Sequence, residues 1–380
     1  MNNKSLRITP INQKIPSAEN GVVCSYPQEF FGYFGWASIT KMDNGDLIVV
    51  ASGLRNAHVC PFGRTVLLRS KDEGRSWTSP RVINDTPLDD RDAGVVSLGG
   101  STLLVTMFTS DNRKYMDYQD YQEHTAEFNQ RYEAMLRWVD DETAKRWLGS
   151  WVRVSKDNGE TWEGFLRAPV NTPHGPIRLE DNRLLYFGKS WEEGLSKGKI
   201  IAYQSRDQGK SWQPLGEVPL FPGTQPENYH EPHLVELPGN VLLGHIRVEN
   251  HTGTKLETLG IENFSIMQTI SKDGGKTWSI PEPFNFHGSP PHLLRHSSGA
   301  LICVYGYRQK PYGERAMISL DNGSTWTIHH ILRDDAPDWD LGYPASVELS
   351  DGSIFTIYYQ KINTEQEKCS LLWTRWKLPE

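Results

Sequence analysis

Short apolar segments alternate with polar turns along almost the whole chain. The segments are rich in Val, Ile, Leu and aromatic residues, and the turns are rich in Gly, Asn and Asp. An apolar segment, a turn of this kind and a second apolar segment together predict a β-hairpin. The chain contains six such hairpins, with turns at Asp43–Asp46, Gly99–Ser101, Glu180–Asn182, Pro238–Asn240, Ser297–Gly299 and Ser350–Gly352.

A second repeat follows five of the six hairpins. Its pattern is S-x-D-x-G-x-[ST]-W, the Asp box, and its aspartates are Asp72, Asp157, Asp207, Asp273 and Asp321. The carboxylate of such a box accepts backbone N–H groups across a tight turn, the glycine adopts positive φ, and the tryptophan packs under the hairpin. We therefore expect the five boxes to stabilise turns rather than to bind a metal or catalyse a reaction.

Six units of about four strands each predict an all-β fold, a six-bladed β-propeller. We expect residues 1–380 to form one domain, with a strand near Leu6–Ile11 completing the last blade. The first interval between boxes is the longest and predicts an insertion at about 111–149 in blade 2. Within it, a helical stripe predicts either a helix packed on the rim or a lid over a pocket; the stripe consists of Phe128, Tyr132, Met135 and Val139.

The charge and composition of the chain argue against several classes of partner and location. The formal net charge is −7 and there is no basic run, which argues against nucleic acid as a partner. No apolar stretch is long enough to span a membrane, and the polar start is unlike a signal peptide, so we expect a cytoplasmic protein. The four cysteines are then expected to be free thiols. His230 and His233 would face opposite sides of a strand, so we predict no metal site and no cofactor.

The unusual polar residues fall on one face of the predicted propeller. In each blade the hairpin turn joins the first and second strands and the Asp box joins the third and fourth, so both lie on one face of the propeller. The other face contains the start of each first strand, the end of each second strand and the loop between the second and third strands. Cations, histidines, carboxylates and aromatic residues gather at these latter positions and predict an anion-binding pocket on the axis. The candidates are Trp36, Arg55, His58, Arg91, Asp92, His174, Glu231, Arg247, Arg308, Arg315 and Tyr343.

This arrangement resembles the sialidase (neuraminidase) superfamily, and the resemblance covers nearly the whole chain. In that family a glutamate is followed 16 residues later by an arginine, as Glu231 is followed by Arg247 in EPHLVELPGNVLLGHIR. A further family arginine precedes the last box, where Arg315 stands. The family's nucleophilic tyrosine opens the sixth blade, as Tyr343 does in GYPASVELSDG.

The resemblance implies a retaining exo-glycosidase that acts on a sialic acid or a related acidic sugar. Arg247 and Arg315 would bind the substrate carboxylate, Tyr343 would attack the anomeric carbon, and Glu231 would accept the phenol proton. An acid must also protonate the leaving oxygen.

Two family residues have no counterpart here. The segment Phe34–Ser38 lacks the family's first arginine, so Arg55, Arg91 or Arg308 would supply a third cation, or the substrate needs only two. The loop from Arg55 to Arg64 lacks the family's acidic aspartate. His58 or Asp92 is the preferred substitute, ahead of Asp90.

Glycoside hydrolysis is therefore the leading expectation, with a carbohydrate substrate that carries a carboxylate. Two alternatives stay open. One is a carbohydrate-binding propeller without activity, and the other is a lyase or a neutral-sugar glycosidase that uses His58, His174 or His233. The sequence leaves the oligomeric state and the sugar undetermined.

Overall fold

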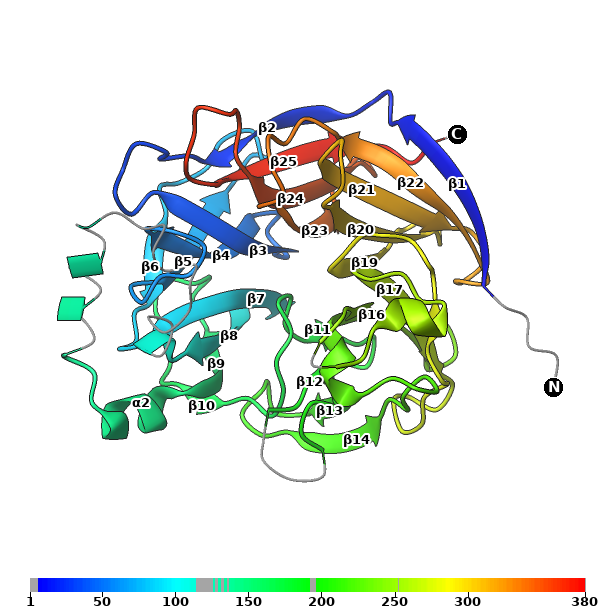
Figure 1. Cartoon of the computed structure of the whole chain (residues 1–380), viewed down its shortest axis with the longest axis horizontal. Coiled ribbons are helices and arrows are strands. Elements are labelled where there is room, and N and C mark those ends of the chain that lie inside the picture. Colours follow the sequence, from blue (N-terminus) through cyan, green and yellow to red (C-terminus); the bar gives the residue numbers. More distant parts are fainter. Residues whose placement is uncertain are drawn as a thin grey trace.

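The computed structural model describes residues 6–113, 126, 129–130, 133–134, 137–191, 196–251 and 253–379. Its strands form six sheets around a central axis (Figure 1). The six-bladed β-propeller predicted from the hairpin repeat is confirmed. Blades 1 to 5 each contain four consecutive antiparallel strands. The N-terminal strands add a fifth strand to blade 5 and the fourth strand to blade 6.

The first three blades follow the predicted hairpins. Blade 1 contains β3 (Tyr33–Lys41), β4 (Leu47–Arg55), β5 (Arg64–Ser70) and β6 (Arg81–Asn84); blade 2 contains β7 (Asp89–Gly99), β8 (Thr102–Ser110), β9 (Gly149–Ser155) and β10 (Leu166–Arg167); blade 3 contains β11 (Ile177–Arg178), β12 (Leu184–Lys189), β13 (Ile200–Ser205) and β14 (Gln213–Glu217).

The last three blades continue the ring, with two short 3₁₀ helices, η3 (Pro226–Asn228) and η4 (Leu256–Leu259), beside blade 4. Blade 4 contains β15 (Tyr229–Leu237), β16 (Val241–Val248), β17 (Ser265–Ser271) and β18 (Glu282–Pro283); blade 5 contains β19 (Pro291–Arg295), β20 (Leu301–Tyr307), β21 (Gly313–Ser319) and β22 (Thr325–Arg333); blade 6 contains β23 (Gly342–Glu348), β24 (Ile354–Gln360) and β25 (Ser370–Trp376).

The N-terminal strands close the ring differently from our expectation. The segment near Leu6–Ile11 belongs to β1 (Arg7–Lys14), which lies parallel to β22 as a fifth strand of blade 5. The following strand, β2 (Glu19–Cys24), pairs with β25 and completes blade 6 (Figure 1). The prediction was wrong because β2 buries only its last two residues, Val23 and Cys24, so its polar start hid the strand.

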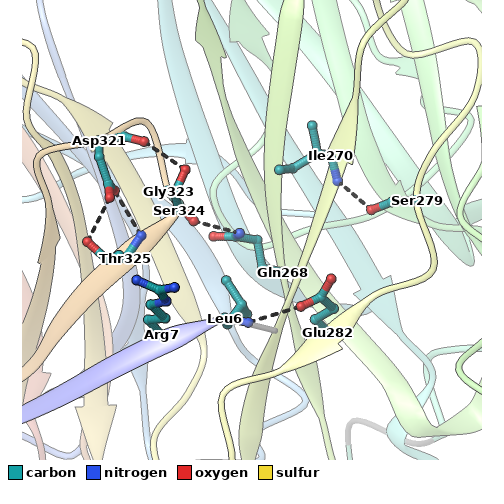
Figure 2. Close-up of a pocket in the computed structure, with 10 residues that line it drawn as sticks. All are labelled: Leu6, Arg7, Gln268, Ile270, Ser279, Glu282, Asp321, Gly323, Ser324 and Thr325. Carbon is teal, nitrogen blue, oxygen red and sulfur yellow. Dashed lines mark hydrogen bonds between the residues drawn. The ribbon is translucent and has the colours of Figure 1, made fainter. Parts of the chain in front are cut away.

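The five Asp boxes share three hydrogen bonds: the aspartate accepts from the backbone N–H and the hydroxyl of the residue four positions later, and the serine accepts from the glycine N–H. In the blade 5 box, Asp321 accepts from the backbone N–H and the hydroxyl of Thr325 (Figure 2). Ser319 Oγ accepts from the Gly323 N–H. The bonds lower the pKa of the exposed Asp72, Asp157 and Asp273 to about 2. These carboxylates therefore stay ionised as turn acceptors. A cavity of about 310 Å³ lies beside the Asp321 box, between residues of the box and Arg7, Gln268, Ile270 and Glu282 of neighbouring strands (Figure 2).

The insertion in blade 2 contains the helix α2 (Asp141–Trp147). Asp140 caps it by accepting from the Thr143 N–H at 2.7 Å. Ala144 of this helix packs against Val139 and Leu88. This contact connects the insertion to the start of blade 2. The remaining stripe residues, Phe128, Tyr132 and Met135, lie outside the described residues.

The core lies between neighbouring blades. Between blades 6 and 1, for example, Phe34 and Val49 pack with Phe355 and Leu371. All four cysteines are buried free thiols. Among the helices that the structure describes, none is both long and apolar enough to cross a bilayer.

Candidate active site

Four inner strands carry the same local distortion, a shift of register. The antiparallel register shifts within β3, β7, β15 and β23. Each strand has one non-glycine residue with positive φ at such a shift, namely Trp36 (52°), Asp92 (47°), Glu231 (44°) and Tyr343 (50°). Such bulges redirect a side chain and are common at functional sites. All four residues line one cavity of about 340 Å³.

Proline explains two of these bulges. Pro232 follows Glu231 and Pro344 follows Tyr343, and neither proline has an N–H for the strand ladder. Pairing therefore breaks where the preceding side chain has to turn toward the axis.

Tyr343, Glu231 and Arg247 form one hydrogen-bonded cluster. The Tyr343 hydroxyl donates to Glu231 Oε1 at 2.6 Å, and Arg247 Nη1 donates to Glu231 Oε2 at 2.5 Å and to Tyr343 Oη at 3.2 Å. Arg247 Nη2 donates to Glu249 at 2.6 Å, and its guanidinium lies over the Phe264 ring. The geometry aligns the phenol proton with a carboxylate.

The cluster sets the protonation of both groups. Burial raises the pKa of Tyr343 well above its ordinary value, and the charge of Glu231 raises it further. Burial alone would raise the pKa of Glu231, but the Arg247 charge and the Tyr343 hydrogen bond outweigh it and lower that pKa. At neutral pH the pair is a phenol beside a carboxylate, as an acceptor of the phenol proton requires.

Of the carboxyl groups that line the cavity, Asp92 has the highest pKa. Burial raises its pKa to about 7, against the opposing charge of Arg91 and with support from Glu231. Asp90, by contrast, accepts from both the backbone N–H and the hydroxyl of Thr86 and does not line the cavity. Of the two aspartates, only Asp92 is therefore placed to give a proton to a ligand there.

His58 also lines the cavity, held by Asp340. His58 Nδ1 lies 2.9 Å from Asp340 Oδ1, and the Tyr33 hydroxyl donates to the same carboxylate. Burial lowers the pKa of His58 although Asp340 opposes this effect. The imidazole is thus largely neutral at pH 7. A neutral ring is a weaker proton source than Asp92 under those conditions.

Arg55 is not available to a ligand. It is fully buried, its two terminal nitrogens bond both oxygens of Asp89, and it also donates to the His58 carbonyl. The expectation that Arg55 binds substrate is therefore corrected: it holds the loop that carries His58. Arg91 does line the cavity, with its guanidinium over the Trp36 ring.

Arg315 also lies away from the cluster. Its guanidinium donates to the carbonyls of Glu314, Arg333 and Pro311 and lies over the Tyr307 ring. It does not line the cavity. Arg308 lies closer to the cluster, with its guanidinium 5.6 Å from the centroid of the Tyr343 ring, and it also donates to the carbonyls of Ser289 and Leu341. Sequence position alone could not show which guanidinium turns toward the axis.

His174 is corrected as well, because it is buried and does not line the cavity. Its Nδ1 lies 3.0 Å from Ser38 Oγ, and its ring packs against His233 and His292. Burial lowers the pKa values of all three histidines, so they are neutral packing groups. Among the described residues, no three His, Cys, Asp or Glu side chains are grouped so as to hold a metal ion.

Sequence reasoning missed several residues around the cavity. They include Asp340, which holds His58, and Phe108, Ser110 and Asn112, which line the cavity wall at the end of blade 2's second strand. Asp340 precedes the first strand of blade 6, and the starts of first strands are expected on the face of the propeller that carries the site. The position of Asp340 on this face was therefore predictable from the sequence.

Comparisons with known proteins agree with this fold. The sequence pattern of the BNR repeat-like domain matches residues 143–356, over half of the chain. A search of curated protein sequences finds no significant match.

Three similar solved structures are distant from this chain in sequence. A Dyadobacter fermentans protein of unknown function is 20% identical, with a TM-score of 0.71, covering 96% of this chain and 100% of that one. The Hadza microbial sialidase Hz136 is 15% identical, with a TM-score of 0.64, covering 95% of this chain and 68% of that one. Penicillium chrysogenum α-L-arabinanase is 16% identical, with a TM-score of 0.58, covering 94% and 98%. These likenesses establish the propeller fold, and the match over residues 143–356 shows that this chain belongs to the BNR repeat-like domain family.

Proposed function

We propose that this protein is an exo-acting, retaining glycoside hydrolase that removes a terminal sialic acid or a related acidic sugar. The observation that carries the proposal is the hydrogen-bonded cluster of Tyr343, Glu231 and Arg247, with Asp92 in the same cavity. A phenol nucleophile suits a substrate whose carboxylate would repel a charged nucleophile, and it is the sialidase solution to glycoside cleavage.

The reaction proceeds in two steps. Tyr343 Oη bonds to the anomeric carbon as the bond from that carbon to the leaving oxygen breaks. Glu231 accepts the phenol proton and Asp92 protonates the leaving oxygen, so the leaving group departs as an alcohol. Water then attacks the anomeric carbon, Asp92 takes a water proton, and Tyr343 leaves with the proton returned by Glu231.

Arginines supply the electrostatics of this scheme. Arg247 Nη1, at 3.2 Å from Tyr343 Oη, stabilises negative charge that develops on the phenol oxygen. Arg91 lines the cavity and Arg308 lies over the Tyr343 ring, so these two cations are placed to attract the substrate carboxylate.

A neutral-sugar glycosidase is the second candidate, and a specific observation favours it. Arg55 and Arg315 are bound to internal partners, and Arg247 already pairs with both Glu231 and Glu249. Fewer cations are then free for a carboxylate than the family resemblance implied. The arabinanase likeness adds that the same propeller occurs in a protein named for a neutral polysaccharide.

A panel of chromogenic glycosides separates the two candidates. Acidic glycosides, including a sialoside, and neutral glycosides, including an arabinoside, are incubated with the wild-type protein and with the Tyr343→Phe variant. The proposal expects release from an acidic glycoside by the wild type alone. Release from neutral glycosides only would favour the second candidate, and no release from any would reject hydrolysis.

The pH profile tests the role of Asp92. Asp92 has to be protonated, so kcat/KM is expected to fall as pH rises through about 7, the pKa that burial gives it. Glu231 has to be ionised, and its lowered pKa keeps it so down to acidic pH. Asp92→Asn is expected to lower kcat/KM by roughly 10²–10⁴-fold and to remove the fall near pH 7.

His58→Gln is the matched control for this profile. It alters the other proton-carrying group on the cavity wall and is expected to keep the fall near pH 7. If the fall instead persists in Asp92→Asn and disappears in His58→Gln, then His58 is the acid and the assignment of Asp92 is wrong.

A further inference from the structure

We infer that a groove between blades 2 and 3 binds the leaving group of the substrate, so that the protein binds oligosaccharides more tightly than glycosides with a small leaving group. This inference rests on the proposed function and extends it. The groove is defined by Phe108, Ser110, Leu148, Asn171, Trp191 and Lys197, and its volume is about 820 Å³. That volume lies within the range of ~300–1,000 Å³ typical of small-molecule sites.

The groove and the catalytic cavity adjoin each other. Phe108 and Ser110, near the end of β8, line both. Phe108 is the register partner of Arg91, which directly precedes Asp92. The groove therefore opens on the side of the cavity where Asp92 lies. Because the acid protonates the leaving oxygen, the leaving group must extend toward that side, into the groove.

Trp191 gives the groove a surface suited to sugars. Trp191 is 57% exposed, whereas tryptophan residues are mostly buried in folded proteins. The C–H face of a pyranose ring is apolar and packs on an aromatic face, while its hydroxyls remain free for polar groups. Leu148, 49% exposed, adds a second apolar surface in the same groove.

The walls of the groove are held in place by the fold. Lys189 Nζ lies 5.1 Å from the centroid of the Trp191 ring and 3.3 Å from His230 Nδ1. The Asn171 backbone pairs with Lys189 in both directions, and Arg167 donates to the Leu148 carbonyl at 2.7 Å. A leaving group would thus meet a largely formed surface, which reduces the entropy lost on binding.

Binding to an inactive protein tests the inference without interference from turnover. Isothermal titration of the Tyr343→Phe variant compares sialyllactose, an acidic trisaccharide, with free sialic acid, which lacks the two further sugars. We expect the trisaccharide to bind at least tenfold more tightly. Adding Trp191→Ala is expected to remove most of that difference and to leave the affinity for free sialic acid unchanged.

Trp138→Ala in the same background is the matched control, because Trp138 is 85% exposed but does not line the groove. It is expected to preserve the tenfold difference, and the melting temperatures of all variants should agree. Equal affinity for the two ligands before Trp191 is changed, an unchanged difference after Trp191→Ala, or no trisaccharide binding would each overturn the inference. The panel of chromogenic glycosides tests the proposed function separately. Release from an acidic glycoside would retain the proposed function even if the groove does not bind the leaving group.

Discussion

Replacing Tyr343 with phenylalanine is expected to reduce kcat by roughly 10³-fold or more, since removing the nucleophile of a catalytic unit abolishes the covalent route. The change removes only the hydroxyl, which bonds Glu231 and Arg247. The ring keeps its packing against Trp36 and Tyr359 and its place beneath Arg308. The free energy of unfolding should therefore change by only about 1 kcal/mol.

Tyr359→Phe provides the matched control for this loss. Tyr359 is a buried tyrosine 6.1 Å from Tyr343, measured between ring centroids, and it does not line the cavity. It should retain most of the wild-type rate. Steady-state kinetics with the glycoside identified by the panel measures both variants. Near-normal turnover by Tyr343→Phe would exclude the tyrosine mechanism.

Replacing Asp89 with asparagine is expected to lower the free energy of unfolding by about 3–5 kcal/mol, because it leaves a buried guanidinium without its counter-charge. Neither Arg55 nor Asp89 exposes any of its side chain to solvent. Asp89 also accepts from Asn112 and Arg91, so several contacts near the cavity depend on it. Denaturant unfolding followed by tryptophan fluorescence measures the loss.

Two further variants show whether the buried charge is the cause. Asp181→Asn breaks a pair with Arg183 in which the carboxylate is 51% exposed, and it should shift the free energy by no more than about 1 kcal/mol. Replacing both partners, as Arg55→Met with Asp89→Leu, should recover part of the stability lost by Asp89→Asn alone. Equal small losses from Asp89→Asn and Asp181→Asn would contradict this account of the pair.

The fold was largely predictable because its signal repeats. Six hairpin turns and five boxes each predict the same kind of local structure. Misreading one of them would therefore leave the predicted number of blades unchanged. Ring closure had no such repetition. It depended on β2, whose residues are mostly exposed and show no clear alternation, and on β1, whose pairing with β22 follows from contacts in the folded protein.

The candidate site was predictable only at the level of its face. The positions of strand starts and ends placed Glu231, Arg247 and Tyr343 on one side of the ring, and the structure brings their side chains into hydrogen-bond contact. The direction of a long side chain depends on partners that are distant in sequence. Arg55 turns to Asp89 and Arg315 turns to backbone carbonyls, and neither partner could be identified from spacing.

Covalent capture on Tyr343 tests the central claim most directly. A fluorinated glycosyl fluoride of the sugar that the panel identifies slows the second step, so the glycosyl-enzyme accumulates, and peptide mass spectrometry locates the attached sugar. The account predicts one sugar on the peptide that contains Tyr343 and none in the Tyr343→Phe protein. A sugar attached to Glu231 or Asp92, or turnover with inverted configuration and no attachment, would contradict it.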